Sequence, residues 1–450
     1  MLDIQNDGVV PSRGKISRRT FVRVGAVGMG MAGLSLPEFF SLKARGAVAT
    51  QPKAKAVIQL WMAGGPTHLD TFDPKPDAGA EYCGPYKNPI ETNVKGIRIG
   101  QDLPLLAKQA DKYSIIRSLT HGDNGHETAT YVMQTCTMPG EVSYPAMGAV
   151  VAYERKAAGY RGLPPYMSIS QPLGRFTESG FLGTDYRVFA TGGDPNSNMV
   201  RVEGLVAPGG VTDERAKQRQ TLLQSVDTLA AGMESKKFAA MDSYREQSYA
   251  LILGEAKKAF DMSEEKPEVR DRYGRNQFGQ SCLLARRLVE RGVPFITINS
   301  GGWDTHRDNF GRMKVLLPPL DQGFSALLED LAQRGLLDST IVTWYGEFGR
   351  TPKMVTGAPW DGGRHHYGNA QSVVVAGGGF KGGAVVGETD AKGEFPKNRT
   401  LYPWDLSASM YTLLGIDPNG RLPHPHGCVA YVTPSASGDL QSGGLLKEIM

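Results

Sequence analysis

The sequence predicts an α/β protein in which helices cover both faces of a mainly parallel central sheet. Apolar runs rich in β-branched and aromatic residues recur along the chain, and segments with a helical spacing of apolar residues lie between them. Strands that are apolar along their whole length are typical of parallel sheets buried on both faces. The 56 glycines and 28 prolines indicate many loops between short elements, which suits this architecture better than a helical bundle.

The strands and helices can be placed from these runs. Six apolar runs are expected to form strands, at residues 56–61, 113–118, 165–170, 293–299, 339–345 and 372–377. Three helices are expected from the spacing of apolar residues, at about 276–291, 313–335 and 404–415.

The stretch 212–265 differs from the rest, because it is dense in charged residues and alanine and poor in β-branched residues. It is expected to form surface helices inserted between the halves of the sheet. Residues 50–450 are therefore predicted to form one domain with this helical insertion.

Residues 1–49 are expected to be an export signal outside the fold. Arg18 and Arg19 precede an apolar stretch at 24–36 that is too short to span a bilayer by itself. Small residues at 47–49 provide a cleavage site, so the pattern matches a twin-arginine signal. We therefore expect a periplasmic or extracellular protein, with no transmembrane segment beyond the signal.

The charge balance argues against a nucleic-acid partner. The whole chain has a net charge of +4, and the first 49 residues carry all of it, with seven Lys and Arg against three Asp and Glu. The remaining chain is close to neutral, so no bulk positive charge is available to attract a polyanion.

Three of the expected strands end in glycine followed by polar side chains. Because ligands bind beyond the carboxyl ends of the strands in open α/β sheets, these three loops are expected to meet at one site. The polar residues are His68 and Asp70 after the strand at 56–61, Asp304 and His306 after that at 293–299, and Glu347 and Arg350 after that at 339–345.

The eight histidines of the chain favour a metal site. Six of them lie in glycine-rich segments beside Asp, Asn or Arg, and none of these six lies on an apolar helix face. Imidazole and carboxylate ligands together suit Zn²⁺ or Mn²⁺, with Ca²⁺ or Mg²⁺ as alternatives, in a centre of one or two ions. The six are His68, His121, His126, His306, His365 and His366.

We expect four residues to surround the first cation, and three others to complete its shell or form a second site. The alternative is a plain structural turn, in which the Asp caps the next helix. The four are Asp304, His306, Glu347 and His366, and the three are His68, Asp70 and His126. Arg350 could hold an anionic group with two hydrogen bonds, or form a salt bridge with Glu347 or a neighbouring loop.

The segments "RRTF", "GGPTHLDTFDPKPDA", "GGWDTHRDNF" and "GEFGRTPK" resemble the exported bacterial domain-of-unknown-function family 1501. The resemblance covers nearly all of the chain after the signal. That family is similar to the alkaline phosphatase and sulfatase superfamily, which implies a three-layer α/β/α sandwich. In that superfamily two divalent metals flank a nucleophile that attacks a phosphate or sulfate ester.

The resemblance implies roles for individual residues. Asp304 and His306 resemble ligands of one metal, and Glu347 resembles the acidic ligand of the second, although Phe348 stands where a histidine is usual. His366 resembles a late histidine ligand, with His365 as its rival.

Two positions depart from the superfamily pattern. The nucleophile position falls on His126, and a loop shorter or longer by one or two residues would bring Thr128 there instead. The Asp that ends the first strand in the superfamily has no counterpart, so His68 or Asp70 could replace it.

Two functions follow as alternatives. The first is an exported metal-dependent hydrolase of phosphate or sulfate esters, whose substrate is an anionic small molecule or glycan ester. The second is a non-catalytic relative that binds an anionic glycan or a cell-envelope partner. The retained histidines and carboxylates favour the first function, and the missing hydroxyl nucleophile favours the second.

Overall fold

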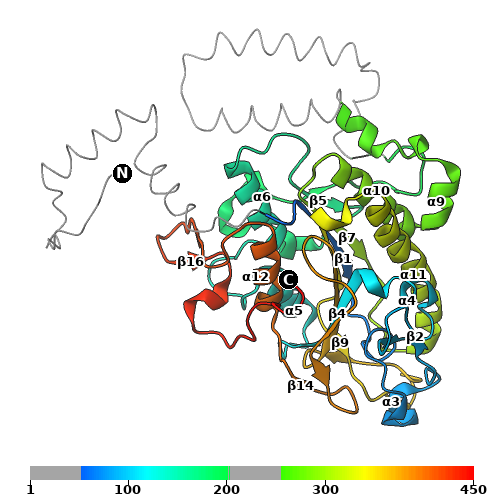
Figure 1. The fold of residues 1–450 in the computed structure, drawn as a ribbon. Coiled ribbons are helices and arrows are strands. Elements are labelled where there is room, and N and C mark those ends of the chain that lie inside the picture. The colour runs from blue at the N-terminus through cyan, green and yellow to red at the C-terminus, as the bar shows by residue number, and fades with distance from the viewer. Residues whose placement is uncertain (1–51, 201, 203–254) are drawn as a thin grey trace, which may run out of the picture. The chain divides into compact units, whose positions relative to one another are not determined.

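The computed structural model describes residues 52–200, 202 and 255–450, and its centre is an eight-stranded sheet (Figure 1). The order of the strands across the sheet is β12-β4-β11-β8-β1-β7-β5-β6. In that order the strands are Val385–Val386, Tyr113–Leu119, Gln371–Ala376, Thr340–Tyr345, Ala56–Met62, Phe295–Ser300, Tyr166–Ile169 and Phe189–Ala190.

All six expected strands are confirmed, and the sheet is mainly parallel. β1 lies between β7 and β8 and pairs with both in parallel, so the loops that follow these three strands leave from the same edge. β11 is the exception, because it runs antiparallel to both β4 and β8.

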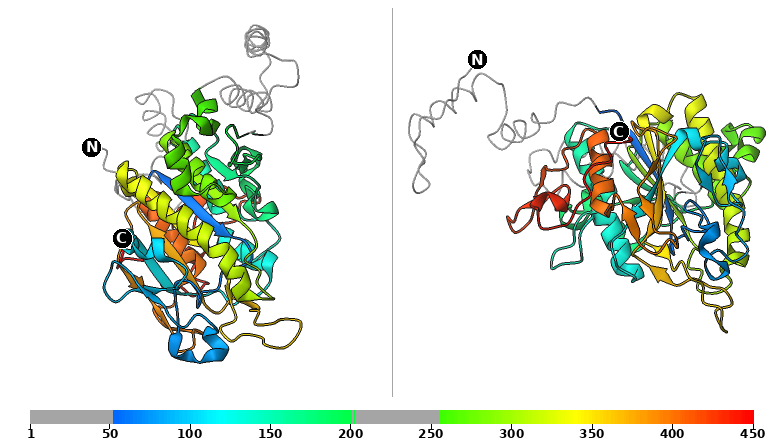
Figure 2. Two further views of the ribbon diagram at one scale, coloured as in Figure 1. Left: turned by 90° about the vertical axis from the view of Figure 1, so that its right-hand side faces the viewer. Right: turned by 60° about the horizontal axis from the view of Figure 1, so that its bottom comes forward.

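Helices cover both faces of the sheet, so the fold is a three-layer α/β/α sandwich (Figures 1 and 2). Alternate residues of β1 belong to two separate cores, as expected for a strand buried on both faces. Ile58 and Leu60 lie in one core, and Val57 and Trp61 lie in the other. The helices of the first core are α4 (Pro104–Ala107), α10 (Gln277–Glu290) and α11 (Asn309–Gln333), and those of the second are α5 (His126–Thr135), α6 (Met147–Ala157) and α12 (Pro403–Leu413).

The three expected helices correspond to α10, α11 and α12. α11 begins at Asn309, earlier than expected, because the Asp308 side chain accepts a hydrogen bond from the Gly311 backbone and caps the helix. No helix in the described part of the chain is long and apolar enough to span a bilayer.

Two expectations fall wholly or mainly on residues that the structure does not describe. The export signal at 1–49 lies outside the described residues, and so does the predicted insertion up to residue 254. Its last part is described, and it forms the 3₁₀ helices Glu255–Phe260 and Met262–Glu264 in place of the expected α-helix.

The remaining elements are short. Four two-stranded sheets are formed by β2 (Ile90–Glu91) with β3 (Arg98–Ile99), β9 (Gly349–Arg350) with β10 (His366–Tyr367), β13 (Glu388–Thr389) with β14 (Pro396–Asn398), and β15 (Arg421–Leu422) with β16 (Ala430–Tyr431). The short helices are α3 (Ala80–Cys83) and α9 (Pro267–Tyr273), with 3₁₀ helices at Pro76–Ala78, Ala110–Lys112, Gly174–Thr177, Gly180–Leu182, Thr184–Tyr186, Leu337–Ser339 and Pro434–Ser437.

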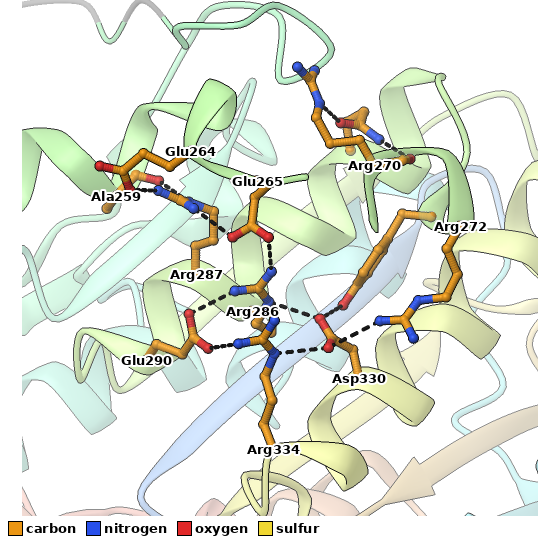
Figure 3. Close-up of polar contacts among 12 residues, drawn as sticks. Ala259, Glu264, Glu265, Arg270, Arg272, Arg286, Arg287, Glu290, Asp330 and Arg334 are labelled. Carbon is orange, nitrogen blue, oxygen red and sulfur yellow. Dashed lines mark hydrogen bonds and ion pairs between the residues drawn. The ribbon is translucent and has the colours of Figure 1, made fainter. Parts of the chain in front are cut away.

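A network of ion pairs joins α10, α11 and the segment that precedes α9 (Figure 3). Its centre is the buried Arg286, whose guanidinium lies 2.8 Å from carboxylate oxygens of Glu265 and Glu290 and 3.0 Å from one of Asp330. Burial opposes the charge of Arg286, but its hydrogen bond to Glu265 and the charges of Glu265 and Glu290 raise its pKa and outweigh burial, so its charge is retained.

Replacing Arg286 with Ala is expected to lower the free energy of unfolding by about 3–5 kcal/mol, because buried carboxylates would lose their counter-charge. Arg275→Ala is the matched control, since its ion pair with Asp271 is largely exposed, and it is expected to cost less than about 1 kcal/mol. Urea denaturation measures both values. Equal losses in the two variants would contradict a structural role for the buried network.

Candidate metal centre

The ends of β1 and β8 are joined by hydrogen bonds to the backbone of two glycines. The Gly64 amide donates to both carboxylate oxygens of Glu347, at 2.9 and 3.1 Å. The Arg350 guanidinium donates to the carbonyl oxygens of Gly64 and Gly65. It also donates to Asp304 at 2.5 Å, which brings in the loop after β7. The three loops therefore converge, as the sequence predicted.

Glycine is required at these positions, because the loops approach too closely for a side chain. Gly64 has φ +112°, and a Cβ atom on it would lie 2.3 Å from the backbone nitrogen of Asp304. Gly65 has φ +80°, and its Cβ would lie 2.5 Å from the Phe348 ring. The glycine pair thus provides the left-handed backbone and the space that the site needs.

Three side chains point their donor atoms at one another where the loops meet. One nitrogen each of His126 and His366 and one carboxylate oxygen of Asp304 all lie within 4.8 Å of one another. Nε2 of His306 lies 2.8 Å from Nε2 of His366 and 3.1 Å from Oδ1 of Asp304. We call these four residues the cluster. His126 is the first residue of α5, so it reaches the cluster from a loop after β4.

Hydrogen bonds at Nδ1 fix which nitrogen of each ring is free. His126 Nδ1 lies 2.7 Å from a Glu347 oxygen, and His366 Nδ1 lies 2.8 Å from the carbonyl oxygen of Asn124. Because both partners accept, both Nδ1 atoms carry a proton, and in its neutral form each ring presents its Nε2 lone pair. The two lone pairs face Asp304, at 3.5 Å from His126 and 3.2 Å from His366.

The pKa directions within the cluster follow from these contacts. The hydrogen bond to Glu347 raises the pKa of His126 and outweighs burial. Burial lowers the pKa of His306 and of His366. Burial opposes the ionisation of Asp304, but the hydrogen bond and charge of the nearby guanidinium hold its pKa below the ordinary value.

This donor set fits a divalent cation. A carboxylate that stays ionised faces nitrogen lone pairs, and such donors need a positive ion between them. Each of the three imidazoles also has a partner at its other nitrogen, which is how protein metal sites orient their histidines. For His306 that partner is Nδ1 of His365, at 2.6 Å. Within the described residues, His126, Asp304 and His366 are the one group of such donors that all lie close enough together to hold an ion.

Glu347 lies at the site, but its contacts differ from those expected of a metal ligand. Its carboxylate is buried, accepts the Gly64 amide and contacts the Nδ1 edge of His126, away from Asp304. It therefore orients the histidine. Phe348 packs on His366, with ring centroids 4.6 Å apart, where the resemblance implied a second metal.

His68 and Asp70 do not join the cluster, which corrects the expectation that they complete a metal shell. Asp70 is buried and paired with Arg364, whose guanidinium contacts both of its oxygens at 3.0 and 3.1 Å. Asn309 donates to the same carboxylate. His68 is buried, and its Nε2 bonds the Gly393 carbonyl at 2.8 Å. Both oxygens of Asp70 are therefore already hydrogen-bonded within the protein, which explains why Asp70 is not a ligand in the cluster.

Arg350 also differs from the expectation that it grips an anion. Its side chain is fully buried, and its four hydrogen bonds go to the carbonyls of Gly64, Gly65 and Arg364 and to Asp304. Of the two salt-bridge partners that were expected, the neighbouring loop is confirmed, because the salt bridge is formed with Asp304 in the loop after β7. Burial lowers the pKa of Arg350 against the raising effect of its hydrogen bond to Asp304.

The two candidate nucleophiles have different surroundings. His126 belongs to the cluster, whereas the Thr128 hydroxyl, two residues further along α5, forms no hydrogen bond with any of its members within the described residues. The contacts of His126 are those of a ligand, with one nitrogen anchored and the other free.

Sequence reasoning missed the supporting roles of two residues, His121 and Asn124. His121 Nε2 donates to the Glu347 carbonyl at 2.7 Å, and burial lowers the pKa of His121. The Asn124 side chain accepts a hydrogen bond from the Gly368 amide at 2.7 Å, beside the bond from its carbonyl to His366. The segment "THGDNGHE" was marked by its histidines, but nothing in the sequence indicated these partners.

The comparisons with known proteins give one family match. A family model described as a protein of unknown function, DUF1501, matches residues 54–433. No curated protein matches the chain.

Several solved structures are distantly similar. The lipoteichoic acid synthase LtaP from Listeria monocytogenes is 8% identical with a TM-score of 0.39, over 85% of this chain and 79% of that chain. The 2-O GAG sulfatase BT1596 is 11% identical with a TM-score of 0.39, over 87% and 75%. The phosphonate monoester hydrolase of Agrobacterium radiobacter is 12% identical with a TM-score of 0.34, over 88% and 79%.

Gly64→Ala is expected to destabilise the protein by about 2–4 kcal/mol, because its Cβ would strain the backbone and overlap the loop after β7. Gly96→Ala is the control, since Gly96 has φ +86° but no atom within 4 Å of its Cβ position, and it is expected to cost about 1 kcal/mol. Denaturant unfolding gives both values. A loss at Gly64 no larger than that at Gly96 would show that close approach is not what requires glycine there.

Proposed function

The chain belongs to the DUF1501 family, and we propose that its mature part is an exported metal-dependent hydrolase of phosphate or sulfate esters. One observation carries the proposal: the Nε2 atoms of His126 and His366 face the Asp304 carboxylate, and each ring is anchored at Nδ1. The sequence resemblance to the alkaline phosphatase and sulfatase superfamily supports the same chemistry.

Four residues would hold the cation: His126, Asp304, His306 and His366. Mixed imidazole and carboxylate donors suit Zn²⁺ or Mn²⁺. When bound, such an ion polarises an ester oxygen and lowers the pKa of a coordinated water.

The other residues of the site act on the four ligands. Glu347 keeps the proton of His126 on Nδ1 and so leaves Nε2 free. Arg350 keeps Asp304 ionised and fixes its position. His365 lies with its Nδ1 2.6 Å from Nδ1 of His306, so it holds the ring of that ligand in place.

A second candidate function is binding of an anionic glycan without turnover. It is favoured by the surroundings of the cluster, because within the described residues no Ser, Thr or Cys side chain is hydrogen-bonded to its four members. A hydrolase built on this site would use water as its nucleophile.

Export is proposed from the sequence alone. Arg18, Arg19 and the apolar stretch at 24–36 form the proposed twin-arginine signal, which would deliver the folded protein to the periplasm or beyond.

The wild-type protein is expected to hold about one Zn²⁺ or Mn²⁺ per chain and to hydrolyse a chromogenic phosphate or sulfate ester. Asp304→Ala and His366→Ala are each expected to lose the metal, and Glu347→Gln to weaken metal binding about 10–100-fold, because the outer carboxylate no longer fixes His126. Metal content is measured by mass spectrometry and activity by dye release.

Asp338→Ala is the matched control, because Asp338 is exposed and precedes β8, at the end of that strand opposite to the loop that carries Glu347. It should keep both metal and activity. A wild-type protein that holds metal but hydrolyses no ester would favour the second candidate function, and one that binds no metal would contradict the hydrolase proposal.

A further inference from the structure

Arg307 is an exposed cation beside the cluster, and it directly follows His306 in the chain. It forms no salt bridge and no side-chain hydrogen bond with any described residue. This sets it apart from the buried Arg350, whose donors are used within the protein. A guanidinium without a carboxylate partner keeps its fork of N–H donors available to an anion.

The side chain of Arg307 is held on an aromatic ring. Its guanidinium carbon lies 5.6 Å from the centroid of Trp360, within the range of a cation–π contact. The same indole packs edge-on against His365, with centroids 4.9 Å apart, and lies 6.2 Å from the His306 ring. Trp360 thus places the cation next to the histidines of the site.

The backbone fixes this arrangement, because the two loops that carry Arg307 and Trp360 are bonded to each other. The Asp308 amide donates to the Trp360 carbonyl at 3.2 Å, and the Arg364 amide donates to the Thr305 carbonyl at 3.0 Å. A Cβ on Gly363 would lie only 1.8 Å from the His306 carbonyl oxygen, so the loops are in close contact.

We propose that Arg307, stacked on Trp360, is an anion subsite at the edge of the metal centre that binds a sulfate or phosphate group of the substrate. The inference rests on the proposed function and names its substrate class: an ester whose anionic group is recognised by a guanidinium. The planar fork suits the tetrahedral oxyanion, and stacking reduces the conformational freedom that binding would remove.

The test is calorimetric titration of the full chain with sodium sulfate and with sodium phosphate, in zinc-loaded and in EDTA-treated protein. Arg307→Ala is expected to weaken binding of the preferred anion about tenfold, because hydrogen bonds to a charged group are lost. Arg307→Lys keeps the charge but loses the fork of N–H donors, so its affinity for the anion is expected to lie between those of the wild type and Arg307→Ala. Trp360→Ala is expected to weaken binding severalfold.

Arg312→Ala is the matched control, because Arg312 is also exposed and contacts the Gly302 carbonyl at 3.5 Å. It should bind the anions within twofold of wild type. Equal binding by the Arg307→Ala and Arg312→Ala variants would overturn the inference, and so would a wild-type protein that binds neither anion.

Metal content and ester hydrolysis, measured on the same samples, separate this inference from the proposed function. Arg307→Ala should keep its zinc. Arg307-dependent anion binding in a protein that takes up no metal would support the subsite and contradict the hydrolase proposal. A metal-loaded, active protein with unchanged anion binding in Arg307→Ala would support the hydrolase proposal and contradict the subsite.

Discussion

The site depends on the hydrogen bonds that Glu347 and Arg350 make with the backbone of Gly64 and Gly65. The carboxylate accepts the Gly64 amide, and the guanidinium donates to both glycine carbonyls. These bonds join the end of β8 to the end of β1. The additional hydrogen bond from Arg350 to Asp304 joins the loop after β7 to them. Any side chain on Gly64 would separate the loops, so the glycine pair, the two charged side chains and the position of Asp304 depend on one another.

The same contacts determine the chemistry of the site. Glu347 and Arg350 are buried, and each has one hydrogen bond to a member of the cluster. The carboxylate orients His126, and the guanidinium keeps Asp304 ionised. Buried charges are costly unless they are bonded, and here their bonding partners are the backbone and the cluster itself. The bonds that join the loops therefore also set the protonation and direction of the donors.

Much of the fold could be predicted from the sequence, because apolar runs mark buried strands directly. The convergence of the three loops followed from the parallel sheet, and the close approach at Gly64 explains the glycines seen after the first strand. That His68 and Asp70 lie outside the cluster could not be predicted. Asp70 pairs with Arg364, which is distant in sequence, and a buried ion pair leaves no local pattern. Backbone partners such as the Asn124 carbonyl cannot be predicted from the sequence either, since every residue has a backbone carbonyl.

The central claim is that His126 and His366 bind a cation through Nε2, with Asp304 on the same ion. Anomalous X-ray diffraction at the zinc edge, from crystals of the zinc-loaded full chain, tests this most directly. The account predicts one strong peak about 2.0–2.2 Å from these three donors, with Nδ1 of His126 still bonded to Glu347. A zinc peak within bonding distance of Glu347 but remote from His126 would contradict the account, and so would the absence of a peak among the three donors.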